Sequence, residues 1–199
     1  MNTTFDFIAM TDVPKFVRKW NSLIDNHTSK SFPKLFVCKR NEELGRHNYL
    51  SNPYQLVCTW MHKDLYPNIG FETSTLLDES KVSVTRTRCR LREKRKGQTK
   101  PQKDDLIFFT ACRIKQTDKE QFLNQFAIAS RYMTECIGFV CYRLYEALSE
   151  ESPFNFVNVA QWRSKKEFID AFQNAEFKNK IRGGFDVQSH IIVAQESCK

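Results

Sequence analysis

An internal repeat constrains the fold of this chain more than any other feature of the sequence. Phe36-Val37-Cys38-Lys39-Arg40 recurs as Phe139-Val140-Cys141-Tyr142-Arg143, about a hundred positions later. Three further matches keep the same order and nearly the same offset: Thr11-Asp12 with Thr117-Asp118, Pro53-Tyr54 with Pro153-Phe154, and Trp60 with Trp162. The matches predict that the chain consists of two divergent copies of one unit.

Each copy is predicted to run strand, helix, strand, strand, helix, strand, because β-rich apolar stretches alternate with segments of helical spacing. In the second copy the predicted strands are 106–112, 137–145, 154–162 and 185–194. Its helices are predicted to begin at Thr117 or Asp118 and at Ser164, with Glu167 in the capping-box position. The first copy is predicted to have strands 4–10, 34–40, 54–60 and 81–92, helix 12–24 and a poorly formed helical segment 63–72.

This βαββαβ order predicts, for each copy, a four-stranded antiparallel sheet with helices on one face. The strands are apolar on both sides, so the other face must also be buried. The duplicate copy supplies a partner sheet. The predicted fold class is therefore α+β: two ferredoxin-like halves that form an intrachain, pseudo-dimeric α+β barrel. The predicted domains are 1–92 and 105–199, joined by a basic linker, 93–104.

The formal net charge of +8 arises from one segment of the chain. Between residues 86 and 103, nine residues are Lys or Arg and one is acidic. Arg86, Arg88, Arg90 and Arg92 alternate, so on a strand they share one side, with Leu91 on the other. Such a ladder is typical of an anion site that follows nucleic-acid phosphates, although it lacks interleaved aromatic residues. The alternative is a solvent-exposed edge strand that its charges keep from aggregating.

Composition and motifs exclude several classes of protein. No apolar run is long enough to span a bilayer, and the N-terminus does not resemble a signal peptide, so we expect no membrane association. The seven dispersed cysteines favour free thiols and a cytoplasmic location over a disulfide framework. Metal-ligand spacings and nucleotide-binding motifs are missing, so the sequence predicts no metal site and no cofactor.

The stretch Phe156-Val157-Asn158-Val159-Ala160-Gln161-Trp162-Arg163-Ser164, continuing to Phe172 and Phe177, resembles the antibiotic biosynthesis monooxygenase family. In that family an apolar strand that ends in Trp leads into a helix that begins with Ser. The resemblance covers the second half and, in degenerate form, the first, and it implies the dimeric α+β barrel fold. Members include cofactor-independent monooxygenases and haem-degrading enzymes. The haem-degrading members imply an Asn on the first strand, which falls near Cys112 or Arg113 here, and a His near Ile181, and this sequence has neither.

The resemblance implies a small aromatic or polycyclic ligand in an apolar cavity of the second half. Trp162 and His190 are the candidate catalytic residues, with His190 as a proton shuttle, although a core Trp and a structural His are the alternatives. Arg113 and Arg143 lie in apolar strands, and a buried Arg there would need a carboxylate or an anionic ligand. The predicted ligand-binding residues are Phe109, Arg113, Phe168 and Phe172.

Two functional hypotheses follow. The first is a monooxygenase-like, small-molecule-binding protein, with a cofactor-independent oxygenase as its enzymatic form and the first half as a structural partner. The second is a non-catalytic module that binds RNA or an acidic partner through segment 86–103, with Arg86, Arg88 and Arg90 as the anion-binding residues. We expect a monomeric pseudo-dimer, and the sequence leaves further oligomerisation open.

Overall fold

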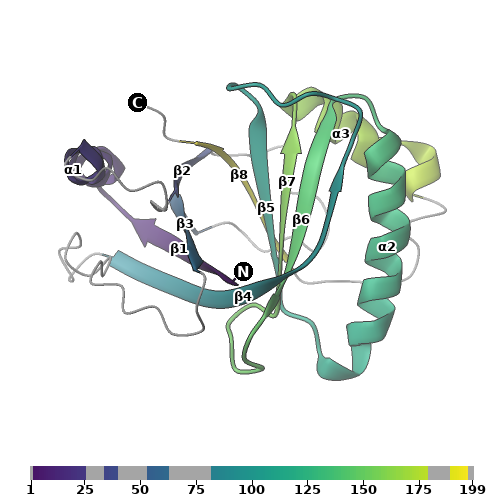
Figure 1. Cartoon of the computed structure of the whole chain (residues 1–199), viewed down its shortest axis with the longest axis horizontal. Helices are drawn as coiled ribbons and strands as arrows, with labels where there is room; N and C mark the ends of the chain where they lie inside the picture. The colour runs from purple at the N-terminus through teal and green to yellow at the C-terminus, as the bar shows by residue number, and fades with distance from the viewer. Residues whose placement is uncertain (1, 26–33, 40–52, 63–81, 179–188, 197–199) are drawn as a thin grey trace.

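The computed structural model describes residues 2–25, 34–39, 53–62, 82–178 and 189–196, which form an antiparallel β-barrel with helices on its outside (Figure 1). The strands of the first half are β1 (Asn2–Met10), β2 (Lys34–Lys39), β3 (Leu56–His62) and β4 (Val82–Lys96), with helix α1 (Val13–Asp25) after β1. The second half contains β5 (Leu106–Cys112), a 3-10 turn (Gln116–Asp118), α2 (Lys119–Glu135), β6 (Phe139–Ala147), β7 (Phe156–Trp162), α3 (Lys165–Gln173) and β8 (Ser189–Glu196). The predicted helical segment 63–72 lies outside the described residues.

The two halves have the same strand order. It is β4-β1-β3-β2 in the first half and β8-β5-β7-β6 in the second. The halves meet where β4 pairs with β6 and β2 pairs with β8, and these two junctions close the barrel. The α+β class and the closed sheet predicted from the sequence are therefore confirmed.

Three apolar clusters follow from the alternation of side chains along the strands. The barrel interior receives residues from all eight strands, including Phe5, Phe36, Phe109 and Ile192. Outside the barrel, α1 covers the first sheet through Phe16 and Trp20. Helices α2 and α3 cover the second sheet, on the opposite side of the molecule (Figure 1). We call this last cluster, which lies between β5–β8 and α2–α3, the second helix layer; its buried members are Phe108, Cys112, Ile114, Phe122, Met133, Phe139, Tyr142, Leu144, Phe156, Ala160, Trp162, Phe168, Ala171, Phe177 and Val193.

Strand β4 is longer than predicted and is not an edge strand. It continues past Arg92 to Lys96, so the first four residues of the predicted linker are strand, because β6 offers pairing partners as far as Cys141. A β-bulge between Leu91 and Glu93 interrupts the alternation, and Leu91 is exposed. Of the four arginines of the predicted ladder, Arg86, Arg88 and Arg90 therefore alternate regularly along one side of the strand, whereas the bulge takes Arg92 out of that alternation.

The two helix starts predicted in the second half have different outcomes. At α3 the prediction is confirmed: Glu167 donates its backbone N–H to Ser164 Oγ at 3.2 Å, and the Ser164 hydroxyl donates to Glu167 Oε2 at 2.8 Å. At α2 the predicted position is correct, because Asp118 is the N-cap residue, but its side chain makes no capping hydrogen bond. Thr117 and Asp118 both lie in the 3-10 turn, where the Thr117 hydroxyl donates to Asp118 Oδ1 instead.

No helix among the described residues is long and apolar enough to cross a membrane. The six described cysteines are free thiols.

Candidate functional site

Trp162, Phe168 and Phe172, which were predicted to lie at one ligand site, are neighbours in the second helix layer. Trp162 is 1% exposed and meets Phe168 edge to face, with 5.6 Å between ring centroids. Phe168 also stacks on Phe108 at 3.9 Å and contacts Phe172 at 4.5 Å. Strand β7 and helix α3 position these rings, because the Ser164 cap begins the helix two residues after Trp162. The arrangement is a closely packed aromatic wall.

Phe109 is not part of this wall. Its neighbour Phe108 faces the helices, whereas Phe109 is fully buried in the barrel interior against Phe5 and Phe36. Successive residues of a strand point to opposite faces, so only one of the two can line the helix layer. Phe109 therefore does not lie together with Trp162, Phe168 and Phe172, and its role in ligand binding stays a prediction.

A row of four side chains with two polar residues at its centre, Thr110 and Asn158, crosses the second sheet next to the aromatic wall. Strand register places Asn158 of β7 opposite Thr110 of β5 and Leu144 of β6, and Thr110 lies opposite Ile191 of β8. Thr110, Asn158 and Ile191 are only half-buried, whereas Leu144 is buried. We call Ile191, Thr110, Asn158 and Leu144 the second-half row.

Asn158 carries an unsatisfied acceptor in this row. Its Oδ1 is shielded from solvent and receives no hydrogen bond from the part of the chain that the structure describes. A buried amide oxygen without a donor costs about 1–3 kcal/mol, so such atoms are rare in folded proteins. The position is therefore suited to a ligand that brings a hydroxyl or N–H group.

A hydrogen-bonded tyrosine lies farther along the same layer. The Tyr142 hydroxyl donates to Glu93 Oε1 and lies 3.2 Å from Ser130 Oγ of α2. The bulge in β4 shifts Glu93 into register with β6, and Glu93 is half-buried. Burial and the hydrogen bond to Glu93 raise the pKa of Tyr142 to about 12. The three side chains link the buried layer to a carboxylate near solvent.

His190 lies in β8 opposite Ala111, in the alternate register position from Ile191. The structure describes the backbone of His190 but not its side chain, so its catalytic role stays a prediction. The predicted roles of Trp162, Phe168 and Phe172 also stay predictions, although their proximity is observed.

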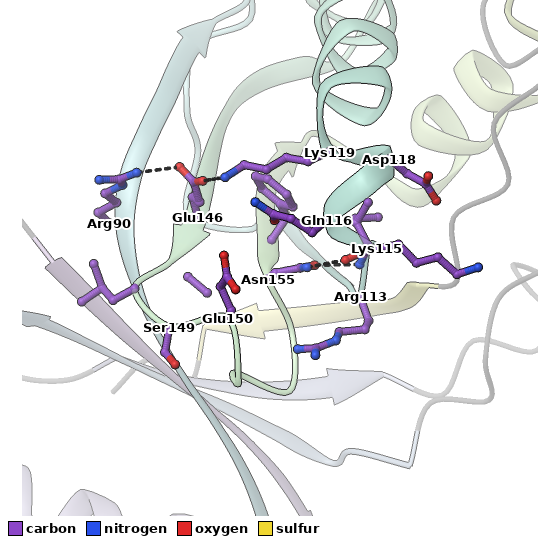
Figure 2. A pocket seen from close by; sticks show the side chains of 14 residues that line it. Arg90, Arg113, Lys115, Gln116, Asp118, Lys119, Glu146, Ser149, Glu150 and Asn155 are labelled. Atoms are coloured by element: carbon purple, nitrogen blue, oxygen red, sulfur yellow. Dashed lines mark hydrogen bonds and ion pairs between the residues drawn. The ribbon is translucent and has the colours of Figure 1, made fainter.

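A charged hollow of about 790 Å³ opens at the end of the second helix layer (Figure 2). At its wall, Glu146 of β6 is 5% exposed and meets three cations. Its carboxylate lies 2.6 Å from Lys119 Nζ, 2.9 Å from Arg92 and 3.2 Å from Arg90. Burial alone would raise the pKa of Glu146, but hydrogen bonds from the cations lower it to about 2. We call this space the Glu146 hollow.

Arg113 lines the Glu146 hollow and not the aromatic wall. It follows the last residue of β5, is exposed, and donates a hydrogen bond to the backbone carbonyl of Ser152. Arg143 is also exposed. The expectation of two buried arginines in apolar strands was wrong, because Arg113 lies just beyond β5 and Arg143 occupies an exposed position of β6.

The predicted anion-binding arginines are mostly engaged within the protein. Arg86 forms a two-pronged ion pair with Asp6, with distances of 2.7 and 2.8 Å, and the Asp6 side chain is fully buried. Arg90 contacts Glu146. Arg86 and Arg88 line a second hollow of about 590 Å³, which Leu148 and Ser149 of the β6–β7 loop separate from the first.

Comparison with known proteins identifies solved structures that share this fold. No protein-family model and no curated protein matches the sequence. Among solved structures, an anthrone oxidase-like protein aligns with 99% of this chain and 91% of its own, at 11% identity and a TM-score of 0.68. A ferredoxin-fold protein from Listeria monocytogenes related to antibiotic biosynthesis monooxygenases aligns with 98% of this chain and 96% of its own, at 15% identity and a TM-score of 0.52.

A heme-degrading enzyme from Listeria monocytogenes covers 97% of this chain and 98% of its own, at 16% identity and a TM-score of 0.51. The family resemblance seen in the sequence is thus confirmed at the level of the fold. At these identities the similarity defines the fold and leaves the chemistry to this chain's own residues.

Sequence reasoning missed Asn158 and Glu146 as site residues. Asn158 stands inside the quoted family stretch, and a polar amide in the middle of an apolar strand was a signal that could have identified it. The predicted strand 137–145 ended one residue before Glu146, whereas β6 continues to Ala147. Its role depends on cations from β4 and α2, which no local pattern of β6 reveals.

Proposed function

We propose that this chain is a monooxygenase-like protein that binds a small hydroxylated aromatic molecule in the second helix layer. The observation that carries the proposal is the shielded Oδ1 of Asn158, which lacks a donor among the described residues. A phenolic hydroxyl would supply that donor. Aromatic rings of the same layer, Phe108, Trp162 and Phe168, supply the apolar contact that such a ligand needs.

The reaction that fits this site is oxidation of an electron-rich phenol or anthrone by dioxygen. The substrate supplies the electrons: anthrone and O₂ give anthraquinone and water, with one oxygen atom entering the ring carbonyl. The chain would exclude water and accept a hydrogen bond from the substrate hydroxyl through Asn158. Tyr142 and Glu93 offer a hydrogen-bonded route for the released proton towards solvent.

2-Hydroxyanthrone is a suitable anthrone probe, because it carries the phenolic hydroxyl that would donate to Asn158 and because one protein with this fold is described as anthrone oxidase-like. We expect the purified chain to raise oxygen uptake and 2-hydroxyanthraquinone absorbance above the buffer rate, and Asn158→Leu to remove that increase. Leu56→Met, in the first half, is the matched control and should keep it. 2-Hydroxyanthrone binding without oxygen uptake would overturn the reaction and leave a binding protein. Neither binding nor uptake would overturn the proposal as a whole.

The ion pairs of the arginine ladder weigh against nucleic-acid binding. A row of nucleic-acid phosphates would need these arginines free and evenly spaced along one side of the strand, but Arg86 is held by the buried Asp6 and the bulge between Leu91 and Glu93 takes Arg92 out of the alternation. We therefore do not propose RNA as the ligand of this segment.

We propose further that the two halves arose by duplication of one βαββαβ unit. The shared strand order, the paired positions of Trp60 and Trp162, and the reciprocal β4–β6 and β2–β8 junctions support this origin. The chain would then be the covalent counterpart of a dimer.

A further inference from the structure

We infer that the Glu146 hollow is a binding site for a small anionic molecule with a phosphate or carboxylate group, held between Lys119 and Arg113. This site is separate from the Asn158 site and does not depend on the proposed function. The Phe156 ring, which is 1% exposed and lies 4.7 Å from that of Phe122, stands between the hollow and the second-half row.

The first support is an excess of positive charge around one buried carboxylate. Glu146 carries a single negative charge, and Lys119, Arg90 and Arg92 all contact it. Two positive charges therefore remain uncompensated in this group, and Lys119 has further N–H donors beyond the one directed to Glu146. Partly buried cations in excess attract an anion more strongly than fully solvated ones do.

The second support is a cation on the opposite wall. Arg113 extends along the lower side of the hollow towards the β6–β7 loop, whereas Lys119 lies along the upper side (Figure 2). Arg113 donates to the Ser152 carbonyl, which leaves other donors of its planar guanidinium for a bidentate contact. Lys115 and Asp118 also line the hollow but point away from it in Figure 2, and their charges cancel.

A second acid, besides Glu146, faces the same space. Glu150, an exposed residue of the β6–β7 loop, directs its carboxylate into the hollow (Figure 2). Among the lining residues, Lys119, Arg90 and Arg113 still outnumber Glu146 and Glu150 by one charge, and Arg92, which contacts Glu146 without lining the hollow, adds a second. Glu150 therefore weakens anion binding without abolishing it, and its removal should strengthen binding.

The size of the hollow favours a small organic anion over a bare ion. A volume of about 790 Å³ falls within the range of ordinary ligand sites. The lining offers polar groups as well as charges, including Gln116 and Ser149. The ligand class is therefore a phosphorylated or polycarboxylated small molecule.

Calorimetric titration of the full chain with pyrophosphate and with citrate, at constant ionic strength set by chloride, tests the site. We expect saturable binding of at least one of them. Arg113→Gln should weaken it about tenfold, and Glu150→Gln should strengthen it about threefold. Lys103→Gln changes the net charge as Arg113→Gln does, but lies outside the hollow, and should leave the affinity nearly unchanged.

The pattern among these variants decides the outcome. Preference for pyrophosphate identifies a phosphate site and preference for citrate a carboxylate site. Failure of both to bind overturns the inference, as does an equal loss in Arg113→Gln and Lys103→Gln, which would show a general charge effect. Arg113 is exposed, so the variant should fold, and a thermal unfolding curve beside each titration verifies this.

Discussion

The two halves of the barrel share a strand order but differ at one row of side chains. In the second half, Thr110 lies opposite Asn158, four residues before the strand ends at Trp162. In the first half the same place, four residues before Trp60, is taken by Leu56, and Ile8 lies opposite it. Leu56 and Ile8 are both fully buried, whereas Thr110 and Asn158 are half-buried.

At this row the two halves therefore present different side chains to the helices that cover them. Ile8 and Leu56 pack with Phe16 and Trp20 of α1, so the first half is closed at this row by apolar contact. The second half has an amide oxygen in the same place and no donor for it within the described chain. We therefore propose that the first half stabilises the barrel and that the second half provides the ligand site.

The next row of side chains, one step closer to Trp60 and Trp162, shows the opposite contrast: it carries a charge in the first half and is apolar in the second. Phe108 and Ala160 of the second half correspond to Asp6 and Cys58 of the first. Asp6 is fully buried and paired with Arg86, and burial together with Asp6 raises the pKa of the Cys58 thiol well above its usual value. The first half thus places a charge where the second half places an aromatic wall.

The largest effect should come from moving the amide to the first half. Leu56→Asn removes a fully buried side chain and buries an amide among Ile8, Phe16 and Trp20. We expect the free energy of unfolding to fall by about 4 kcal/mol, measured by urea denaturation. Leu56→Met, which keeps the volume, should cost about 1 kcal/mol or less. Equal costs for the two variants would contradict apolar closure of the first half.

The next effect concerns Glu146 and pH. Its folded-state pKa of about 2 lies below its ordinary value of 4.5, so its contribution to stability is fully present above about pH 4.5 and is lost as the pH falls towards 2. That contribution is on the order of 3 kcal/mol. The difference in unfolding free energy between wild type and Glu146→Gln should shrink over this interval. A difference that stays constant between pH 6 and pH 2 would contradict the role of the three cations.

A smaller effect is expected at Tyr142. Tyr142→Phe removes the hydrogen bonds to Glu93 and Ser130, but Glu93 can reach solvent and Ser130 Oγ still lies 3.1 Å from the Ala127 carbonyl. The free energy of unfolding should fall by about 1 kcal/mol in thermal or urea denaturation. A loss as large as that of Leu56→Asn would mean that Tyr142 is mainly a structural support.

The smallest effect on stability should come from Asn158→Leu, the mirror image of the first variant. Replacing an unsatisfied amide by an apolar side chain of similar size should leave the free energy of unfolding unchanged or raise it by up to about 1 kcal/mol. Urea denaturation measures the change. Strong destabilisation would show that Asn158 has a structural partner, and the contrast between the two rows would fail.

Local patterns predicted much of the fold and less of the site. Strand β5 and the Ser164 cap of α3 follow from short stretches of sequence, and both were predicted correctly. Phe108 and Phe109 are adjacent and equally apolar, so alternation alone could not show which one faces the helices. The bulge in β4 depends on the pairing of β4 with β6, and the Glu146 cluster joins residues of β4, β6 and α2. The sequence of one segment therefore could not predict either feature.

The central claim is that the Asn158 side chain recognises a hydroxyl group in the second helix layer. Equilibrium titration of wild type and Asn158→Leu with 2-hydroxyanthraquinone and anthraquinone, which differ by one hydroxyl, tests it most directly. We predict that wild type prefers the hydroxylated compound about tenfold and that Asn158→Leu loses the preference while still binding anthraquinone. An equal preference in both proteins would contradict the claim.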